Sequence, residues 1–532
     1  MPALFRVLVL DGVSFTGVSV LSSVPSIEVV ESKSLKEDEL VAKLPDFDAL
    51  VVRSQTKVTA KALEASPRLK VVGRAGVGVD NVDVPAATRR GVVVMNTPGG
   101  NTVSTAEHSF SMLMALARHI PQANASVRAG EWDRKSFQGV EINNKVLGII
   151  GMGRIGTEVA RRAIAFGMRV LAYDPYLAQA KARSLQVELH DKLADMLPHC
   201  DFLTLHMPMT PETKGILNKE SLPKCKKGVR IVNCARGGLV DELDLVEGIR
   251  SGQVAGAALD VFEVEPLPSD HPLRTLPQVI MTPHLGASTA EAQESVGIEI
   301  AESIRELLLT GSVRNAVNMP NVDAKTMSTL RPYLDLGAKL GLIAGQLAGT
   351  RCESLSVSYA GKIKDHDTSS VSRAALKGFL THAIGSDVNE VNVLHHAENL
   401  GLKFAEYKLS DEVEYTELIT VVAKTGDGRT VEVGGSYFGN APRIVRLNGQ
   451  NLEARPEGVL LILENRDRPG IVGWVGTLLG KHKVNIASMS LGRSAPGSSA
   501  LSVLSLDSMP GKEVLAEIRK DGDITSVHIV QL

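Results

Sequence analysis

Residues 146–156 read Val-Leu-Gly-Ile-Ile-Gly-Met-Gly-Arg-Ile-Gly, and this stretch decides how the chain around it folds. The first five residues are a short apolar run that predicts a buried strand, and the remainder has the spacing Gly-x-Gly-x-x-Gly. Residues 157–166 then show helical spacing, and a second apolar run at 169–173 ends at Asp174. Strand, glycine turn, helix, strand and acid within about 30 residues are typical of a dinucleotide-binding βαβ unit.

The three glycines and the acid each suit a different part of a dinucleotide. Gly151 allows the tight turn, Gly153 lets the backbone approach a pyrophosphate, and Gly156 lets the helix pack on the strand. The helix N-terminus offers unpaired N–H groups and a positive dipole end to the phosphates. Asp174 can accept hydrogen bonds from a ribose diol and would repel a 2′-phosphate, so the sequence favours NAD over NADP. A glycine-rich turn that binds nothing is the alternative.

The composition is that of a globular protein with several domains. The chain has 532 residues, 44% of them apolar and 22% charged, which predicts three or four domains of about 150 residues each. The formal net charge of −2 and the lack of a basic block argue against nucleic acid as a partner. The four cysteines are too few and too scattered for a disulfide framework or a metal site, so we expect no metal.

Two further features bear on where the protein works. The first residues lack the layout of a signal peptide, and no apolar run approaches the roughly 20 residues that cross a bilayer. The scattered cysteines fit a reducing compartment. The sequence therefore predicts a soluble, cytoplasmic protein without a membrane partner.

Residues 5–100 alternate apolar runs with helical patterns. The runs lie at 6–10, 27–30, 49–52, 69–72 and 92–95. Apolar runs separated by helices predict a parallel α/β sheet, whose ligands bind beyond the carboxyl ends of the strands. Arg53 and Arg74 lie at two such ends, and Arg74 stands in the glycine-rich stretch 73–78. We expect these two arginines to bind an anion, and ordinary surface charge is the alternative.

Four more apolar runs follow the dinucleotide unit, and each delivers polar residues where it ends. The runs lie at 200–206, 228–234, 255–261 and 279–283. The polar residues at their ends are His206, Arg236, Asp260 with Glu265, and His284. On one parallel sheet these side chains would meet at one edge of the dinucleotide crevice.

These residue types suit oxidoreduction at a hydroxyl or carbonyl group. With a nicotinamide cofactor, one protein group must move the proton and another must fix the carboxylate of the substrate. His284 is the candidate acid–base, since imidazole titrates near neutral pH. Glu265 can hold its other ring nitrogen, and Arg236 can bind a 2-oxo carboxylate through two parallel hydrogen bonds. The alternative is that these three are structural polar groups.

The remaining segments predict long helices and two C-terminal units. Residues 103–120 predict one helix, and 287–310 predict another whose start at Ser288 resembles a capping box. Trp132 is interpreted either as a core residue or as an oligomer contact. Residues 311–323 are expected to form a linker.

The C-terminal third divides again. Residues 326–450 show helix and strand signals without a chemical motif, and their histidines at 366, 395 and 396 are expected in surface loops. Residues 458–532 show the order βαββαβ of a small ferredoxin-like module, with a turn at 495–498.

Several motifs together resemble the D-2-hydroxyacid dehydrogenase family. They are the glycine loop with Asp174, Asn-Cys-Ala-Arg-Gly-Gly at 233–238, Ala-Leu-Asp-Val-Phe-Glu-Val-Glu-Pro at 258–266, and Pro-His-Leu-Gly-Ala-Ser-Thr at 283–289. Further motifs narrow the resemblance to the D-3-phosphoglycerate dehydrogenase branch: Val-Arg-Ser at 52–54, Val-Gly-Arg-Ala-Gly-Val-Gly-Val-Asp-Asn at 72–81, and Met-Asn-Thr-Pro-Gly-Gly-Asn at 95–101. The resemblance covers essentially the whole chain, in the long form with an intervening domain and a C-terminal ACT domain.

The resemblance implies oxidation of 3-phospho-D-glycerate to 3-phosphooxypyruvate with NAD, the first committed step of L-serine biosynthesis. Arg236, Glu265 and His284 would match the catalytic residues of the family. The positions that would contact NAD are Gly151, Gly153, Arg154, Ile155, Gly156, Asp174, His206, Met207, Pro208, Cys234, Ala235, Asp260, Gly286 and Ala287. The positions that would bind the substrate are Arg53, Arg74, Gly76 and Asn101.

The resemblance also implies the fold class, which is α/β with four domains. These are a Rossmann-like NAD domain, a discontinuous flavodoxin-like substrate domain, an α+β intervening domain like an allosteric substrate-binding domain, and a ferredoxin-like ACT domain. The implied boundaries are 1–98 with 287–318 for the substrate domain, 99–286 for the NAD domain, 319–455 for the intervening domain and 456–532 for the ACT domain. The sequence pattern by itself does not show the discontinuity.

In the ACT domain the resemblance places Asn465, Asp467 and Asn485 at effector positions, where L-serine would bind between neighbouring domains and inhibit the enzyme. It places Trp132 in a dimer interface, so we expect a homo-oligomer, either a tetramer or a dimer. Two other functions stay open. One is a D-2-hydroxyacid dehydrogenase of the glyoxylate or hydroxypyruvate type, and the other is a non-enzymatic scaffold that senses NAD.

Overall fold

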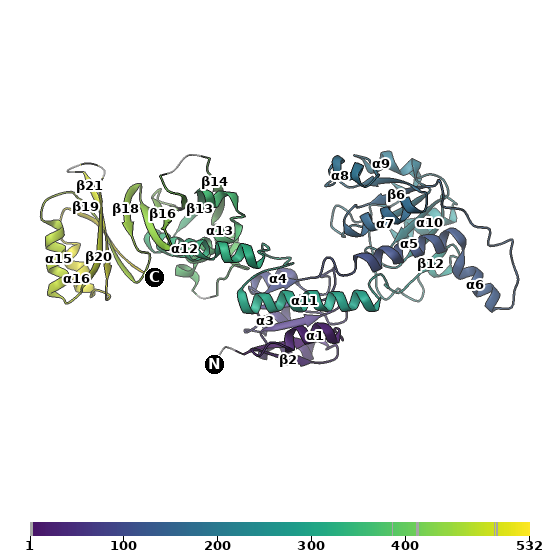
Figure 1. Cartoon of the computed structure of the whole chain (residues 1–532), viewed down its shortest axis with the longest axis horizontal. Coiled ribbons are helices and arrows are strands. Elements are labelled where there is room, and N and C mark those ends of the chain that lie inside the picture. The colour runs from purple at the N-terminus through teal and green to yellow at the C-terminus, as the bar shows by residue number, and fades with distance from the viewer. Residues whose placement is uncertain (1–3, 350, 386, 411–413, 494, 496–497) are drawn as a thin grey trace.

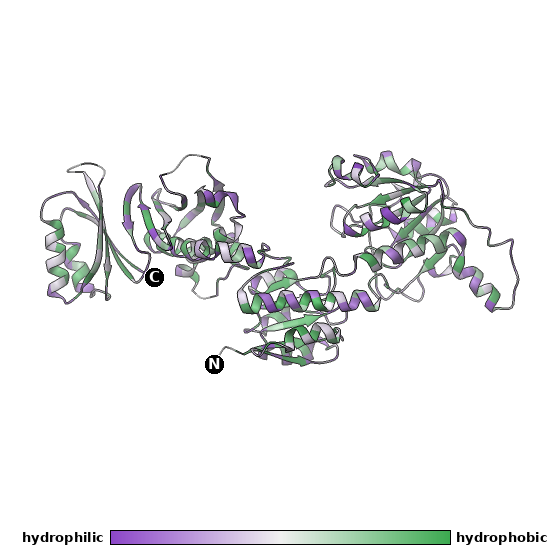
Figure 2. Cartoon of the chain, in the orientation of Figure 1, coloured by the Kyte–Doolittle hydropathy of each residue, from purple (hydrophilic) through white to green (hydrophobic). Residues whose placement is uncertain are grey.

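The computed structural model describes residues 4–349, 351–385, 387–410, 414–493, 495 and 498–532, and these residues form four sheets. The first sheet lies between the second sheet on one side and the two C-terminal sheets on the other, so the molecule is elongated (Figure 1). Apolar residues gather on the strands and on the helix faces that cover them (Figure 2). Part of the expected turn at 495–498, namely residues 496 and 497, lies outside the described residues.

The first sheet is parallel, with the strand order β2-β1-β3-β4-β5. Its strands are β1 (Phe5–Val9), β2 (Ile27–Glu31), β3 (Ala49–Val52), β4 (Val71–Arg74) and β5 (Val93–Met95). Its helices are α1 (Phe15–Ser22), α2 (Glu37–Lys43), α3 (Ala60–Glu64) and α4 (Val84–Arg89). Alternate residues enter two apolar clusters: Val7 and Val9 face one, Leu8 and Leu10 the other. Both faces are buried, as the continuous apolar runs predicted.

Helix α11 (Ala290–Thr310) packs on this first sheet although it follows the last strand of the second sheet. A Cβ atom at Gly17 of α1 would lie only 2.5 Å from the backbone of Gly297, so the two helices cross with their backbones in contact. The helix is capped by Thr289, whose side chain accepts a hydrogen bond from the backbone N–H of Ala292. The expected cap at Ser288 is therefore wrong by one residue.

The second sheet is also parallel, with the strand order β12-β11-β10-β9-β6-β7-β8. Its strands are β6 (Val146–Ile150), β7 (Arg169–Tyr173), β8 (Glu188–Leu189), β9 (Phe202–Leu205), β10 (Val229–Asn233), β11 (Val254–Leu259) and β12 (Val279–Met281). Its helices are α5 (Thr102–Arg118), α7 (Arg154–Ala165), α8 (Gln179–Ser184), α9 (Leu193–Met196) and α10 (Glu242–Arg250). The strand order reverses between β6 and β9, which is where doubly wound sheets bind their ligands.

Helix α6 (Ile120–Arg128) and the loop that follows it project away from the second sheet (Figure 1). No residue of α6 is buried, and Trp132 in the loop is 82% exposed. The interpretation of Trp132 as a core residue of its own domain is therefore wrong.

The third sheet begins the C-terminal half, with the strand order β14-β13-β15-β16-β17-β18. Its strands are β13 (Cys352–Gly361), β14 (Lys403–Lys408), β15 (Glu417–Thr425), β16 (Thr430–Phe438), β17 (Ala441–Leu447) and β18 (Gln450–Ala454). Its helices are α12 (Ala324–Ala348), α13 (Ser369–Ile384) and α14 (Val393–Asn399). His395 and His396 lie in α14, so the expectation of a surface loop there is wrong.

The fourth sheet is antiparallel, with the strand order β20-β21-β19-β22. Its elements are β19 (Val459–Arg466), α15 (Ile471–Lys481), β20 (Ile486–Arg493), β21 (Ser499–Leu506), α16 (Lys512–Ile518) and β22 (Ile524–Gln531). One face packs on α15 and α16, while Leu460 and Ile462 on the other face join the apolar core of the third sheet. The last two units therefore share a core. Among the described helices, none is long and apolar enough to cross a membrane.

Candidate active site

The glycine loop connects β6 to α7 and leaves one open face. A Cβ at Gly151, whose φ is 95°, would lie 2.5 Å from the His206 carbonyl oxygen, and a Cβ at Gly156 would lie 2.2 Å from the Gly151 carbonyl oxygen. By contrast, a Cβ at Gly153 would have no neighbour within 4 Å among the described residues. No side chain caps α7 at Gly153, so its first N–H groups are free to bind an anion. This geometry suits a pyrophosphate.

Asp174 follows β7 and lies against the glycine loop. Its Oδ2 accepts a hydrogen bond from the backbone N–H of Met152 at 2.7 Å, and its Oδ1 accepts one from that of Tyr176 at 2.9 Å. The carboxylate is thus fixed beside the loop and half exposed, where a ribose diol could reach it.

Two buried side chains directly follow β9 and β10. His206 Nε2 lies 2.9 Å from Thr204 Oγ1, while Nδ1 has no hydrogen-bond partner among the described residues. Burial lowers the pKa of His206 to about 3, so the ring is neutral and keeps one nitrogen for a ligand. Burial raises the pKa of the Cys234 thiol to about 12, so it stays protonated. Met207 and Pro208 follow β9, and Ala235 follows β10 at the same edge.

Asp260 stands at the end of β11 and is completely buried. Its Oδ1 accepts hydrogen bonds from Thr282 Oγ1 at 2.6 Å and from the backbone N–H of Leu285 at 2.7 Å. Its Oδ2 accepts one from the N–H of Gly286 at 2.9 Å. Burial alone would raise the pKa of Asp260, but hydrogen bonds from His108, Thr282 and Leu285 outweigh it and hold the pKa below its usual value. The anion therefore fixes the loop after β12.

His284 lies in that loop and meets Glu265 across it. His284 Nδ1 and Glu265 Oε2 are 2.8 Å apart, and Glu265 Oε1 accepts a hydrogen bond from the Phe262 N–H at 3.0 Å. The hydrogen bond to Glu265 raises the pKa of His284, against the opposing effect of burial. Burial would raise the pKa of Glu265, but the hydrogen bonds from His284 and Phe262 leave it below its usual value. This is a carboxylate–imidazole pair with Nε2 free for chemistry.

A cavity of about 650 Å³ joins this pair to the first sheet. From the first sheet it is lined by Arg53, Arg74 and Gly76, and from the second by Glu265 and His284. The cleft between the two parallel sheets therefore brings together residues that lie 190 to 230 positions apart. Ala287 also lines it, while Asn101 is the N-cap residue of α5.

The cations of this cleft are incompletely partnered. Burial and the repulsion of Arg236 lower the pKa of Arg74 to about 10, and Arg74 Nε is buried without a hydrogen-bond partner among the described residues. Asn101 Oδ1 is likewise buried and unpartnered. Arg236 Nε lies 3.4 Å from Oδ2 of Asp80, a carboxylate that is 79% exposed. Besides Asp80, the buried Asp11 attracts Arg74. The three converging arginines still outnumber these two carboxylates, which favours an anion.

Comparison with known proteins identifies the family of the chain. Three family models match: D-isomer specific 2-hydroxyacid dehydrogenase, NAD binding domain, at residues 110–286; D-3-phosphoglycerate dehydrogenase intervening domain at 329–448; and ACT domain at 459–523. The chain is 43% identical over 530 residues to the D-3-phosphoglycerate dehydrogenase of Bacillus subtilis, which covers 99% of this chain and 100% of that protein. It is 42% identical over 527 residues to that of Methanocaldococcus jannaschii, covering 99% and 100%. The chain belongs to the D-3-phosphoglycerate dehydrogenase family.

A solved structure of another dehydrogenase is similar to part of this chain. The NAD-dependent formate dehydrogenase of Staphylococcus aureus in complex with NAD is similar over 58% of this chain and 98% of that chain, with 29% identity and a TM-score of 0.52. With its NAD-binding domain and its membership of the D-3-phosphoglycerate dehydrogenase family, the chain is an NAD-dependent oxidoreductase. The predicted fold class and the choice of NAD are confirmed.

The structure also places near the dehydrogenase site residues that sequence reasoning missed. Ser54 and Gln293 line the same cavity, and His108 of α5 lies 3.2 Å from Asp260. The sequence around His108 does not indicate that this helix residue lies beside Asp260, which follows a strand about 150 positions later. Gln293 stood in a predicted helix and showed no separate signal.

The expected effector residues of this dehydrogenase do not come together in one chain. Asn465 is buried and donates to the carbonyl oxygen of Arg466, and Asp467 Oδ2 accepts a hydrogen bond from Arg493 at 2.9 Å. Asn485 instead donates to Asp507 Oδ2 at 2.7 Å. The pairing of the strands puts Asn465 and Asn485 at opposite ends of the fourth sheet.

Proposed function

We propose that the protein oxidises 3-phospho-D-glycerate to 3-phosphooxypyruvate with NAD, and so catalyses the first committed step of L-serine biosynthesis. The observation that carries this proposal is the single cavity that joins the His284–Glu265 pair to Arg53 and Arg74. A phosphorylated hydroxy acid has an anion at each end and a hydroxyl between them. It needs cationic contacts for both anions near an acid–base group. The cavity supports this, because Arg53 and Arg74 line it together with His284, and Arg236 lies close enough to repel Arg74.

The two ends of the substrate would bind to different arginines. Arg236 would take the carboxylate, because its contact with the exposed Asp80 is long and an incoming carboxylate can replace it. Arg53 and Arg74 would take the phosphate, with Gly76 and Asn101 beside them. Backbone hydrogen bonds to Asp11 and from Asn81 hold the Arg53 segment in place.

The proton moves through His284. Its Nε2 takes the hydroxyl proton of the substrate, because Glu265 already occupies Nδ1. As this O–H bond breaks, the hydrogen on the same carbon leaves as hydride and the C–O bond becomes a carbonyl. Bound NAD supplies the hydride acceptor. Glu265 stabilises the imidazolium that forms, and in the reverse direction His284 returns the proton to the new hydroxyl.

The residues expected to contact NAD follow the carboxyl ends of β6, β7, β9, β10, β11 and β12, which supports a cofactor site at that edge of the second sheet. The open face at Gly153 and the uncapped start of α7, where Arg154 and Ile155 lie, fit the pyrophosphate. Asp174 fits the ribose diol, and the unpartnered Nδ1 of His206 supports a ligand nearby. Asp260 and Gly286 would flank the nicotinamide end.

NADH consumption tests the proposed reaction in the reverse direction. The purified protein is offered 3-phosphooxypyruvate, hydroxypyruvate and glyoxylate at equal concentrations. A strong preference for the phosphorylated acid is expected. Equal rates on the unphosphorylated acids would favour a glyoxylate- or hydroxypyruvate-type dehydrogenase. No turnover on any of the three, together with tight NADH binding, would favour the NAD-sensing scaffold.

We also propose that L-serine inhibits the enzyme at a site shared between two ACT domains. Asn465 and Asn485 lie at opposite ends of one sheet, so one small amino acid cannot touch both within one chain. A second copy in the reverse direction would bring Asn485 beside Asn465 and Asp467. If millimolar L-serine changes neither the rate nor the melting temperature, this part of the proposal is wrong.

The projecting segment supports self-association. The exposed α6 and the loop after it extend from the second sheet as an arm that carries the exposed Ile120, Val127 and Trp132 (Figure 1). We propose that this arm binds a second copy, which gives a dimer, and that pairing of ACT domains extends it to a tetramer.

The division into four domains, with boundaries at 98, 286, 318 and 455, is part of the same proposal. The four sheets support it.

A further inference from the structure

Helix α5 presents a polar face to the loop that carries the proposed acid–base. Ser104 and Thr105 donate hydroxyl hydrogen bonds to the carbonyl oxygen of Gly286 at 3.0 and 3.1 Å. One helical turn further on, His108 Nε2 lies 3.3 Å from Thr282 Oγ1 and, on the same side, close to Asp260. The spacing of three and four residues puts these side chains on one face of α5. The loop between β12 and α11 is therefore held from a helix about 180 positions earlier.

His108 completes the set of donors around a buried carboxylate. Its Nε2 lies 3.2 Å from Asp260 Oδ1, which also receives hydrogen bonds from Thr282 and Leu285. A carboxylate only accepts hydrogen bonds, so Nε2 of His108 must carry the proton in this contact. A buried anion that loses a donor is destabilised and relaxes toward other partners.

The loop held by Asp260 is under conformational strain. His284 has a φ of 56°, in the left-handed region that a residue with a Cβ rarely adopts. Its backbone N–H donates to the carbonyl oxygen of Asp260 at 2.9 Å. Such a conformation is energetically unfavourable and persists only where the surroundings enforce it. The backbone carbonyl of Asp260 therefore holds His284, and the carboxylate of Asp260 holds Thr282, Leu285 and Gly286.

We propose that His108 is a positioning residue for the reaction, because it completes the hydrogen bonds of Asp260 and so fixes the loop that holds His284 against Glu265. The expected effect of His108 on kcat rests on the proposed function. His108 itself does not line the substrate cavity. It acts through Asp260 and Thr282.

The same side chains have the composition of a metal site, and the geometry favours hydrogen bonding. Ligand-type atoms of His108, Cys234 and Asp260 lie within 4.8 Å of one another. Both carboxylate oxygens of Asp260 are already engaged by donors, and burial raises the pKa of the Cys234 thiol to about 12. A protonated thiol is a poor ligand, so we assign the cluster to loop positioning.

The test compares two substitutions at one position. His108→Phe keeps the volume and removes the donor, while His108→Gln keeps an N–H near the place of Nε2. We expect kcat for reduction of 3-phosphooxypyruvate to fall about tenfold in His108→Phe, with little change in KM, and to recover largely in His108→Gln. The exposed His199→Gln serves as the control variant.

A second measurement needs no turnover. Modification of His284 by diethyl pyrocarbonate, followed by peptide mass spectrometry from pH 5.5 to 8.5, reports the titration of that ring, since only neutral imidazole reacts. We expect its midpoint to move to lower pH in His108→Phe, because a loosened loop weakens the contact with Glu265 that raises the pKa of His284.

The two measurements separate the failure of each idea. If the wild type reduces none of the acids offered but the midpoint still moves in His108→Phe, the proposed function is wrong and the positioning role stands. If the wild type turns over while both variants keep its kcat and its midpoint, the positioning role is wrong. A variant that only lowers the melting temperature, with kcat per folded molecule and midpoint unchanged, also overturns it.

Discussion

Two pairs of residues have nearly the same separation along the chain, yet the members of one pair are in contact and those of the other are far apart. Glu265 and His284 are 19 residues apart and lie in hydrogen-bond contact. Asn465 and Asn485 are 20 residues apart and lie at opposite ends of the fourth sheet. Asn465 lies six strand positions from Val459, which is on the side of Asn485, so the distance is roughly 20 Å.

The difference follows from the strand end that each residue occupies. In the parallel second sheet every strand ends at the same edge, so Glu265 after β11 and His284 after β12 meet there. Strands β19 and β20 also run in the same direction, because both pair antiparallel with β21, but Asn465 lies near the end of β19 and Asn485 lies just before the start of β20. Residues that follow neighbouring parallel strands can therefore form a site within one chain, whereas a residue at the end of β19 meets one at the start of β20 only if a second copy is placed in the reverse direction.

The largest expected effect is at His284, the proposed acid–base. His284→Ala should lower kcat for reduction of 3-phosphooxypyruvate about 10³-fold, since general acid–base catalysis contributes about 10²–10⁴-fold. The rate is measured by NADH absorbance, and the melting temperature shows that the variant is folded. The exposed His199→Ala should keep the wild-type rate. A His284→Ala variant within tenfold of the wild type would remove the histidine from the mechanism.

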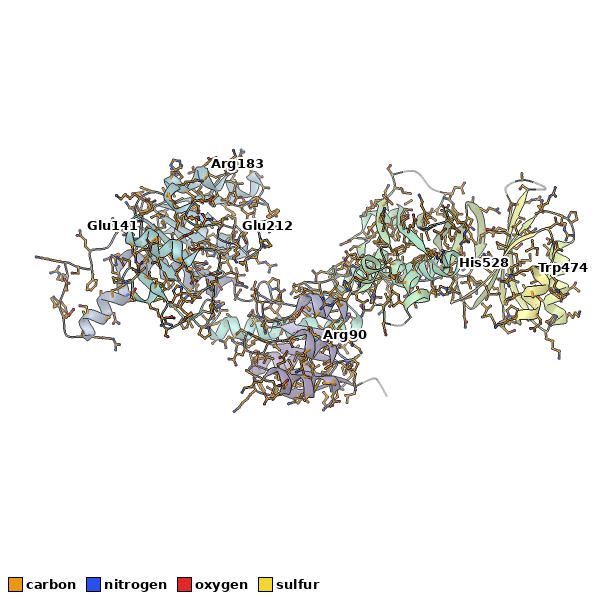
Figure 3. The ribbon with its side chains drawn as sticks, turned by 180° about the vertical axis from the view of Figure 1, so that it is seen from behind. Arg90, Glu141, Arg183, Glu212, Trp474 and His528 are labelled. Carbon is orange, nitrogen blue, oxygen red and sulfur yellow. The ribbon has the colours of Figure 1, made fainter. Side chains whose placement is uncertain are left out.

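The next effect concerns the cations that the first sheet contributes to the cleft. Arg74→Ala should raise KM for 3-phosphooxypyruvate about tenfold or more, because a charge-assisted hydrogen bond to a phosphate is lost. KM for hydroxypyruvate, which has no phosphate, should change little. Arg183→Ala, on an exposed helix (Figure 3), is the matched control. An equal rise for both acids would assign Arg74 to the carboxylate or to the fold.

A smaller effect tests whether the ACT site belongs to one chain or two. Asn465→Ala and Asn485→Ala should each weaken inhibition by L-serine about tenfold or more, with Asn399→Ala as the control. Oligomers that combine both variants should regain inhibition at half of their sites, because one of two shared sites then keeps both asparagines. If mixed oligomers stay insensitive, both residues act within a single chain and the comparison fails.

The two parallel sheets were predictable because their strands are continuous apolar runs between helices. The expected runs at 49–52 and 169–173 are observed as β3 and β7, and the end of β9 differs by one residue. The element order of the ACT module was predictable for the same reason. The strand order, and the return of α11 to the first sheet, depend on packing between segments far apart in sequence, such as Gly17 against Gly297.

The candidate site was predictable where a residue type follows a strand, because strand ends share an edge. His284, Glu265 and Arg236 followed that rule. His108 lies on a helix face, where a histidine has no pattern that distinguishes it from a surface residue. The cap at Thr289 was missed because the neighbouring Ser288 has similar chemistry, and local propensity cannot choose between them. The helix at His395 spans only seven residues, which is too short for a clear apolar period.

The smallest expected effect is a shift in the pH dependence of the rate, which tests the contact between Glu265 and His284. Glu265→Gln keeps the shape and an acceptor for His284 Nδ1 but removes the charge. Oxidation needs neutral imidazole, so its rate rises as pH increases through the pKa of His284, which the contact with Glu265 raises. In Glu265→Gln that pKa falls, so the acid limb of the oxidation rate should move to lower pH while the maximum drops. The profile of kcat against pH for 3-phosphoglycerate oxidation shows both changes. A limb that stays in place would mean that another group controls it, and the close approach of Glu265 and His284 would then be structural, as the contact of Asn485 with Asp507 is in a single chain.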